Sequence, residues 1–368
     1  MRARLPHALA ALAVSALALG ALVAPAAAAP KTAYTVTNLT SDIPGMAANT
    51  DSHLQNSWGL DAGPTTPWWV SDNQTNVATL YNASGVAQFP PPAGPLVVDV
   101  PGGPTGLVFN RTNSSFTIMD SSGDTGKAFF LFDGEDGVIR GWNPNLPPPP
   151  FSTQSQVAVP NSTGAIYKGL AISANPDRLY AADFHNGTVD VFDGSFTPIH
   201  NPGQFTDPDL PPGFAPFGIQ NIGDQIFVAY AKQDADAEDD VAGQGLGFVD
   251  VYDRDGSFLQ RVATRGQLNA PWGLAVAPND FGRFSGDLLV GNFGDGTIHA
   301  FAQNSDGTWH PAGTLRGADH KPITIDGLWA LQFGKGATTV NGPTNTLFFT
   351  AGPNDENDGL FGTITTGS

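Results

Sequence analysis

The sequence predicts an all-β protein that forms a single six-bladed β-propeller. It contains 44 glycines and 31 prolines and almost no helical periodicity, which indicates short strands joined by turns. Six segments each begin with a turn or aromatic residue, a glycine and an aliphatic strand residue, and their glycines are 47 to 63 residues apart. These segments are Trp58-Gly59-Leu60, Thr105-Gly106-Leu107, Lys168-Gly169-Leu170, Phe217-Gly218-Ile219, Trp272-Gly273-Leu274 and Asp326-Gly327-Leu328. Such units bury a core only when they stack, and radial stacking gives a propeller.

A second apolar run follows each opening strand and ends in polar residues. These runs cover residues 68–73, 116–120, 179–183, 226–230, 287–292 and 347–352. A third strand follows in most units, for example at residues 188–192, 247–252 and 297–301. The proline run at 147–150 is interpreted as a rigid surface excursion.

The last unit lacks a fourth strand. Residues 34–39 alternate like a strand and precede the first blade. We expect them to pair with residues 359–365 and so close the ring, because an unpaired edge would remain otherwise.

The N-terminus has the features of an export signal. Arg2 and Arg4 precede an apolar run at 9–23, and small residues follow. We predict a signal peptide over 1–28, with cleavage after Ala28 or, as the alternative, after Ala29. Residues 29–368 are then one propeller domain, soluble and either extracellular or held in the cell envelope.

Charge and cysteine content limit the partners. The net charge is −18, and removal of the two signal arginines makes it −20. Such a surface repels nucleic acid and anionic membranes, so neither is an expected partner. The sequence has no cysteine, so its stability must come from a packed core and not from disulfides, and catalysis by a thiolate is excluded. We expect a monomer whose partner is a small molecule or an extracellular protein.

Propeller geometry brings the ends of the second strands and the residues before the inner strands to one mouth of the channel. The residues expected to bind a ligand there are Asn56, Trp58, Asp72, Asn73, Lys232, Gln233, Trp272, Asp326 and Asn354. His185, Asp295 and Asp355 are expected at the same mouth. Trp58 and Trp272 fit two interpretations, packing of the propeller or stacking on a ligand.

A ring of carboxylates and amides at this mouth suits Ca²⁺, which prefers oxygen ligands. The candidate ligands are Asp120, Asp183, Asn292, Asp234 and Asp236. The alternative is that Asp and Asn cap turns, and that the acidic run at 234–240 is a solvated loop and not a lid. The run does not match an EF-hand, because Asp239 and Gly245 stand where that loop needs glycine and glutamate. No cofactor is required, and Ca²⁺ is the one candidate.

Two function classes remain. The first is a non-catalytic binding module, favoured because the sequence has no serine-hydrolase elbow, phosphate loop or HExxH motif. The second is a divalent-metal-dependent hydrolase or lyase of lactonase type, which needs at least three side chains converging on the axis. Of the histidines, only His185 is placed near the mouth, which gives little support to a zinc lyase.

Long stretches of the chain resemble one family of exported bacterial conserved hypothetical proteins. They are residues 56–60, 69–75, 214–253, 270–301 (APWGLAVAPNDFGRFSGDLLVGNFGDGTIHAF) and 325–364. Some members carry an exosortase-sorting tail, which this sequence lacks, and related copies occur in a giant virus. The resemblance implies an NHL-like propeller and no particular activity.

Overall fold

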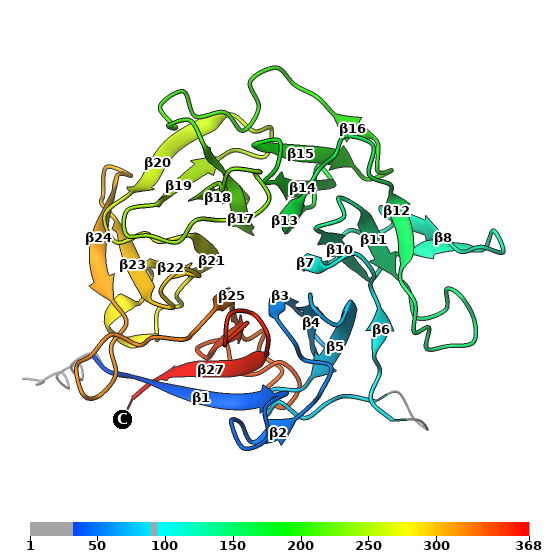
Figure 1. The fold of residues 1–368 in the computed structure, drawn as a ribbon, viewed down its shortest axis with the longest axis horizontal. Coiled ribbons are helices and arrows are strands. Elements are labelled where there is room, and N and C mark those ends of the chain that lie inside the picture. Colours follow the sequence, from blue (N-terminus) through cyan, green and yellow to red (C-terminus); the bar gives the residue numbers. More distant parts are fainter. Residues whose placement is uncertain (1–31, 90–93, 368) are drawn as a thin grey trace, which may run out of the picture. The chain divides into compact units, whose positions relative to one another are not determined.

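Six sheets, antiparallel apart from the short β1–β2 pair, surround a central channel in the computed structural model, which describes residues 32–89 and 94–367 (Figure 1). The predicted propeller is therefore confirmed. The predicted signal peptide, residues 1–28, lies outside the described residues.

Within each blade the chain runs outward from the channel. Blade one contains β3 (Ser57–Asp61), β4 (Trp68–Asp72), β5 (Val77–Tyr81) and β6 (Val98–Asp99). Blade two contains β7 (Pro104–Phe109), β10 (Phe130–Gly134), β11 (Ile139–Trp142) and β12 (Gln156–Val159). Blade three contains β13 (Tyr167–Ser173), β14 (Arg178–Asp183), β15 (Thr188–Asp193) and β16 (Pro198–Ile199).

The second half repeats this order. Blade four contains β17 (Phe214–Ile222), β18 (Gln225–Lys232), β19 (Gly247–Tyr252) and β20 (Phe258–Thr264). Blade five contains β21 (Pro271–Val276), β22 (Leu288–Asn292), β23 (Ile298–Gln303) and β24 (Trp309–Thr314), with the short 3₁₀ helix η1 (Gly282–Phe284) between its first two strands. Blade six contains β25 (Leu328–Phe333), β26 (Leu347–Ala351), β27 (Leu360–Thr366), β1 (Tyr34–Ser41) and β2 (Asn49–Thr50).

The N-terminal strand closes the ring, as predicted. β1 pairs antiparallel with β27 from Tyr34↔Thr366 to Ser41↔Leu360. The buried hydroxyl of Tyr34 also donates a hydrogen bond of 3.0 Å to the carbonyl of Phe281 in blade five. The first and last described strands are thus both part of the last blade.

The repeated glycines are explained by the close approach of neighbouring inner strands. A Cβ atom on Gly59 would lie 2.5 Å from the carbonyl oxygen of Thr105 in blade two. A Cβ atom on Gly273 would meet the carbonyl oxygen of Trp329 in blade six at the same distance. In blades one to five only glycine leaves room for this backbone contact, so the glycine marks the innermost point of those blades.

Blade six departs from the predicted phase. Its equivalent of Trp58-Gly59-Leu60 is Trp329-Ala330-Leu331, because Leu331 lines the channel beside Leu60. Gly327 instead has φ +62° in the turn before β25. The prediction therefore placed the motif of blade six three residues too early, on Gly327 instead of Ala330.

Blade two also departs from the prediction. Residues 116–120 are not its second strand; they contribute β8 (Thr117–Met119), which pairs with β9 (Thr125–Lys127) in a hairpin between β7 and β10. This hairpin lies at the periphery, far from the inner strand β7 (Figure 1). The placement of Asp120 at the mouth is therefore wrong. Its carboxylate accepts the backbone N–H groups of Ser122 and Asp124 and caps the hairpin turn.

The blades pack through aliphatic and aromatic side chains of facing sheets. Between blades one and two, Trp69 stacks on Phe130 with ring centroids 4.3 Å apart. Trp142 and Phe132 complete this buried cluster. In the part of the chain that the structure describes, no helix is long and apolar enough to cross a membrane.

Candidate functional site

One end of the channel collects charged and amide side chains from five blades. The second strand of each blade ends beside the first residues of the inner strand, as in the pairs Ser57↔Asp72 and Tyr167↔Asp183. The links after these strands therefore lie at this end. We call the resulting cluster the acidic mouth; it comprises Asn56, Asn73, Glu135, Lys168, Asp239, Asp240 and Glu356.

Lys168 is the buried centre of the acidic mouth. Its side chain is 2% exposed, and Nζ donates to Glu135 Oε1 at 2.5 Å and to Asp239 Oδ1 at 3.0 Å. Nζ also lies 5.4 Å from the centre of the Trp58 ring. Burial alone would lower the pKa of Lys168, but Glu135 and Asp239 outweigh it and raise that pKa. Lys168 is therefore a fixed positive charge.

Hydrogen bonds extend from Glu135 around the mouth. Asn73 Nδ2 donates to Glu135 Oε2 at 2.9 Å. Asn56 Nδ2 lies 3.3 Å from Asn73 Oδ1 and donates to Glu356 Oε2 at 2.7 Å. Trp329 Nε1 donates to Asn56 Oδ1 at 3.1 Å. The network joins three neighbouring blades, six, one and two.

Carboxylates outnumber ammonium groups in this network. Burial raises the pKa of Asp240 to about 7, although Lys168 opposes the shift and Glu356 and Asp239 add to it. Burial also raises the pKa of Glu356. Asp240 Oδ2 is buried and has no hydrogen-bond partner among the described residues. The site therefore holds more negative charge than Lys168 compensates.

Aromatic rings form the floor beneath the acidic mouth. Phe293 stacks on Trp329 with centroids 3.9 Å apart, and Trp329 stacks on Trp58 at 3.5 Å. Trp272 meets Trp58 edge to face, and its Nε1 donates to the carbonyl of Lys168 at 2.8 Å. Trp58 is 3% exposed, so the packing interpretation describes it, whereas Phe293 and Trp272 stay partly exposed.

The side chains predicted to ring the mouth do not converge: Asp120 lies in the peripheral hairpin, and the others bond to their own surroundings. Asp72 accepts hydrogen bonds from Ser57 and Thr79 of its own blade. Asp183 accepts the backbone and side-chain N–H groups of Asn186. Asn292 Nδ2 donates to the carbonyl of Gln267. Each side chain forms hydrogen bonds near the turn of its own blade. This matches the alternative stated from the sequence, that Asp and Asn cap turns.

The other predicted residues surround the mouth. Gln233 Nε2 donates to the carbonyl of Phe184 at 2.6 Å. This bond attaches the acidic loop, residues 234–240, to blade three. His185 Nδ1 lies 3.2 Å from the carbonyl of Ala237 in that loop. Asp234 Oδ1 accepts the N–H of Glu238 inside the loop.

The remaining three predicted binding residues and the last candidate metal ligand have simpler surroundings. Lys232 Nζ lies over the Phe214 ring at 5.7 Å. Asp326 Oδ2 accepts the N–H of Asn354 at 2.9 Å. Asp236 is exposed.

Among residues 32–89 and 94–367, no group of three or more His, Cys, Asp or Glu side chains is arranged to hold a metal ion. The lactonase-type alternative requires such a convergence, and the predicted ring does not provide it.

Several residues of the acidic mouth and of the aromatic floor beneath it were not predicted as ligands. Glu135 was missed because blade two was aligned on the hairpin. The run Phe130-Leu131-Phe132-Asp133-Gly134 before Glu135 carries the expected signal, an apolar strand that ends in Asp. Trp329 was missed because alanine replaces the motif glycine in blade six. Lys168 occupies the same motif position as Trp58 and Trp272, which is the one sequence signal for its axial place.

Comparisons with known proteins identify relatives and the fold. An uncharacterised protein of Acanthamoeba polyphaga mimivirus is 31% identical over 340 residues, which cover 90% of this chain and 80% of the relative. A second uncharacterised mimivirus protein is 31% identical over 339 residues, 90% of this chain and 85% of that relative. No family model matches the chain.

Two solved structures show the same fold at low identity. A Bacteroides thetaiotaomicron protein of unknown function has a TM-score of 0.56 and 11% identity, covering 90% of this chain and 76% of its own. A streptogramin B lyase has a TM-score of 0.50 and 12% identity, and the match covers 91% of this chain and 98% of the lyase.

Proposed function

The chain belongs to the family of these uncharacterised mimivirus proteins, and from that premise we propose that it is a non-catalytic binding propeller whose acidic mouth binds a cationic group. The group is an ammonium or guanidinium. The predicted export signal supports a place of action outside the cell or in its envelope.

The observation that carries the proposal is the uncompensated charge of the acidic mouth. Glu135, Asp239, Asp240 and Glu356 surround the single ammonium of Lys168. A raised carboxyl pKa means that the site gains free energy by taking up positive charge, and a proton is one source of it. A bound cation is another source, and it would also pair with Asp240 Oδ2.

The aromatic floor supports an organic cation. Phe293 and Trp272 are partly exposed and pack in one aromatic cluster with Trp58, whose ring lies 5.4 Å from Lys168 Nζ, and cations are attracted to the faces of such rings. Ca²⁺ is the competing ligand for this mouth. It needs six to eight oxygens, whereas Glu135 and Asp239 are engaged with Lys168 and Glu356 with Asn56, which leaves Asp240 as the carboxylate with an unpaired oxygen in this cluster.

Calorimetric titration with butylguanidinium and butylammonium tests the proposal, with butanol and pentanamide as neutral counterparts and CaCl₂ as a third arm. We expect both organic cations to bind at pH 8 and to bind at least fivefold more weakly at pH 5.5, which lies below the pKa of about 7 of Asp240. Asp240→Asn should weaken binding at pH 8 by about tenfold, since a cation loses one charged partner.

Asp319→Asn is the matched control, because Asp319 is a 61% exposed carboxylate that pairs with Lys321. This variant should bind as the wild type does. Equal affinity for the neutral compounds, or no binding of either cation, would contradict the proposal.

A hydrolase or lyase is the second candidate, and one observation favours it. A carboxyl group with a pKa of about 7 and an unpaired oxygen, such as Asp240, is suited to general acid–base catalysis. Turnover of lactones or aryl esters above the buffer rate, lost in Asp240→Asn and rising with pH near 7, would replace the binding proposal with this one.

A further inference from the structure

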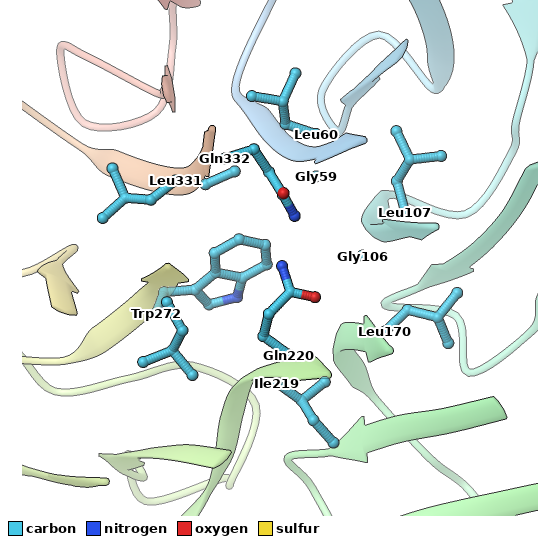
Figure 2. Close-up of a pocket in the computed structure, with 12 residues that line it drawn as sticks. Gly59, Leu60, Gly106, Leu107, Leu170, Ile219, Gln220, Trp272, Leu331 and Gln332 are labelled. Atoms are coloured by element: carbon cyan, nitrogen blue, oxygen red, sulfur yellow. The ribbon is translucent and has the colours of Figure 1, made fainter. Parts of the chain in front are cut away.

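The channel is nearly filled along its axis, so its two ends are separate surfaces. Trp272 and the carboxamides of Gln220 and Gln332 point into the centre of the channel, whereas the surrounding leucine side chains of the inner strands point away from it (Figure 2). The remaining cavity is about 30 Å³, which is room for about one water molecule. A ligand at one end cannot pass to the other.

The end opposite the acidic mouth contains a cavity of about 270 Å³. Arg111 and Lys335 line it together with Gln220, Gln332, Val276 and Phe333. We call this cavity the basic opening. It continues into the channel, since Gln220 and Gln332 line both spaces.

A buried carboxylate holds the two cations in place. The Asp61 side chain is 5% exposed and lies 3.2 Å from Lys335 Nζ and 3.6 Å from Arg111 Nη2. It also accepts the backbone N–H groups of Ala62 at 2.8 Å and Phe109 at 2.9 Å. Burial would raise its pKa, but Lys335 and Arg111 outweigh that effect, so the pKa is lowered and Asp61 stays ionised.

Lys335 has further supports. Its Nζ donates to Gln332 Oε1 at 3.0 Å and lies 5.6 Å from the centre of the Trp68 ring. Its side chain is 20% exposed, so it is fixed at the cavity wall and does not swing freely in solvent. Ordering this lysine costs no further side-chain entropy when a ligand arrives.

The charges of Arg111, Lys335 and Asp61 sum to one positive charge at the cavity, on a chain whose net charge is −18. The side chain of Arg111 is 58% exposed, and its one contact of 3.6 Å with Asp61 leaves other N–H donors available for a planar oxyanion. Val276 and Phe333 give the cavity apolar walls beside these donors.

We propose that the basic opening binds a small organic monocarboxylate, with its carboxylate on Arg111 and Lys335 and its apolar body against Val276 and Phe333. One net positive charge matches a monoanion better than a dianion. The volume equals that of about nine water molecules, which suits a compact acid and not a polymer. This site lies beyond the proposed function, because the acidic mouth is at the other end of a filled channel.

Titration with benzoate and isobutyrate tests the proposal, with benzamide and isobutyramide as neutral counterparts. We expect both carboxylates to bind and the amides to bind at least tenfold more weakly. Arg111→Gln should reduce the affinity for benzoate by at least tenfold, and raising NaCl from 50 to 500 mM should reduce it severalfold.

Two further variants keep the result interpretable. Val276→Asp leaves Asp61 and both cations untouched but places a negative charge at the wall, so it should also weaken benzoate binding by at least tenfold. Lys321→Gln is the matched control, because Lys321 is a surface cation with an 82% exposed side chain, and it should bind benzoate normally. Absence of carboxylate binding at 10 mM, equal binding of the amides, or normal binding by Val276→Asp would each overturn the proposal.

Discussion

The two ends of the channel repeat one arrangement with opposite charge. At the acidic mouth a buried lysine, Lys168, lies between Glu135 and Asp239. At the basic opening a buried carboxylate, Asp61, lies between Arg111 and Lys335. In each case the central charge is almost fully buried and its partners reach towards solvent, so the partners set the charge that a ligand meets.

The difference between the ends lies in the groups beyond these triads. Asp240 and Glu356 add negative charge at the acidic mouth, whereas amides and apolar side chains complete the basic opening. The central ions thus serve the fold, and the excess around them is available to a ligand. The following predictions separate these two roles.

The largest effect is expected from removing the central carboxylate. Asp61→Ala leaves the N–H groups of Ala62 and Phe109 without an acceptor and two cations without their partner. We expect a loss of about 2–4 kcal/mol in the free energy of unfolding at pH 7, measured by urea denaturation.

The pH dependence of this loss has a definite sign. The folded-state pKa of Asp61 is lowered, so its contribution is present above the unfolded-state pKa of about 4 and is lost as the pH falls through the folded-state value. The difference between wild type and Asp61→Ala should therefore shrink below pH 4. A constant difference would show that the charge of Asp61 has no part in it.

Removing the central lysine should cost less. Lys168→Met keeps a long side chain over Trp58 but leaves Glu135 and Asp239 without their cation. Because Glu135 is 35% and Asp239 74% exposed, water compensates in part, and we expect a loss of about 1–3 kcal/mol at pH 7. Urea denaturation measures this loss, and a loss of less than about 0.5 kcal/mol would contradict the prediction.

Removing an excess carboxylate should stabilise the protein. The pKa of Asp240 is raised to about 7, so its contribution to stability is greatest below pH 4 and declines as the pH rises to about 7. Asp240→Asn should therefore gain about 1–2 kcal/mol over wild type at pH 8 and nothing at pH 4. Asp133 and Asp250 also have raised pKa values, so only the difference between the two proteins isolates Asp240. Destabilisation at pH 8 would show that Asp240 is a structural residue.

Calcium should have the smallest effect. The described carboxylates at the acidic mouth form no group arranged to hold a metal ion, so millimolar CaCl₂ against EDTA should change the melting temperature by less than about 1 °C. A rise of several degrees that disappears in Asp183→Ala would instead restore the axial ring that the sequence suggested.

The sequence predicted the blades and their closure because those depend on local patterns. The strand alternation at residues 34–39 and the glycine within the inner strands of blades one to five can be recognised in the sequence itself. The error at residues 116–120 arose because an inserted hairpin with an apolar strand ending in Asp looks the same as a blade strand. The residue pattern within a single blade does not distinguish the hairpin strand from the second strand of the blade.

The site was harder to predict because it joins residues from different blades. Lys168 meets Glu135 and Asp239, which are 33 and 71 positions away with no periodic relation. The buried state of Lys168 follows from the width of the channel, which only the assembled ring determines. The loops that carry the side chains of the acidic mouth can be located in the sequence. Which of their carboxylates lack a positive partner depends on how the blades pack.

The pairing of β1 with β27 also sets an order of assembly. Tyr34 and Thr366 are opposite each other in the register, although they are separated by nearly the whole chain. During synthesis from the N-terminus, β1 emerges first and has to wait for its partner, while five other sheets can form from contiguous segments. Without a disulfide, this joint is held by backbone hydrogen bonds and packing alone. We therefore expect the ring to close at this pairing last during folding and to open there first under mechanical force.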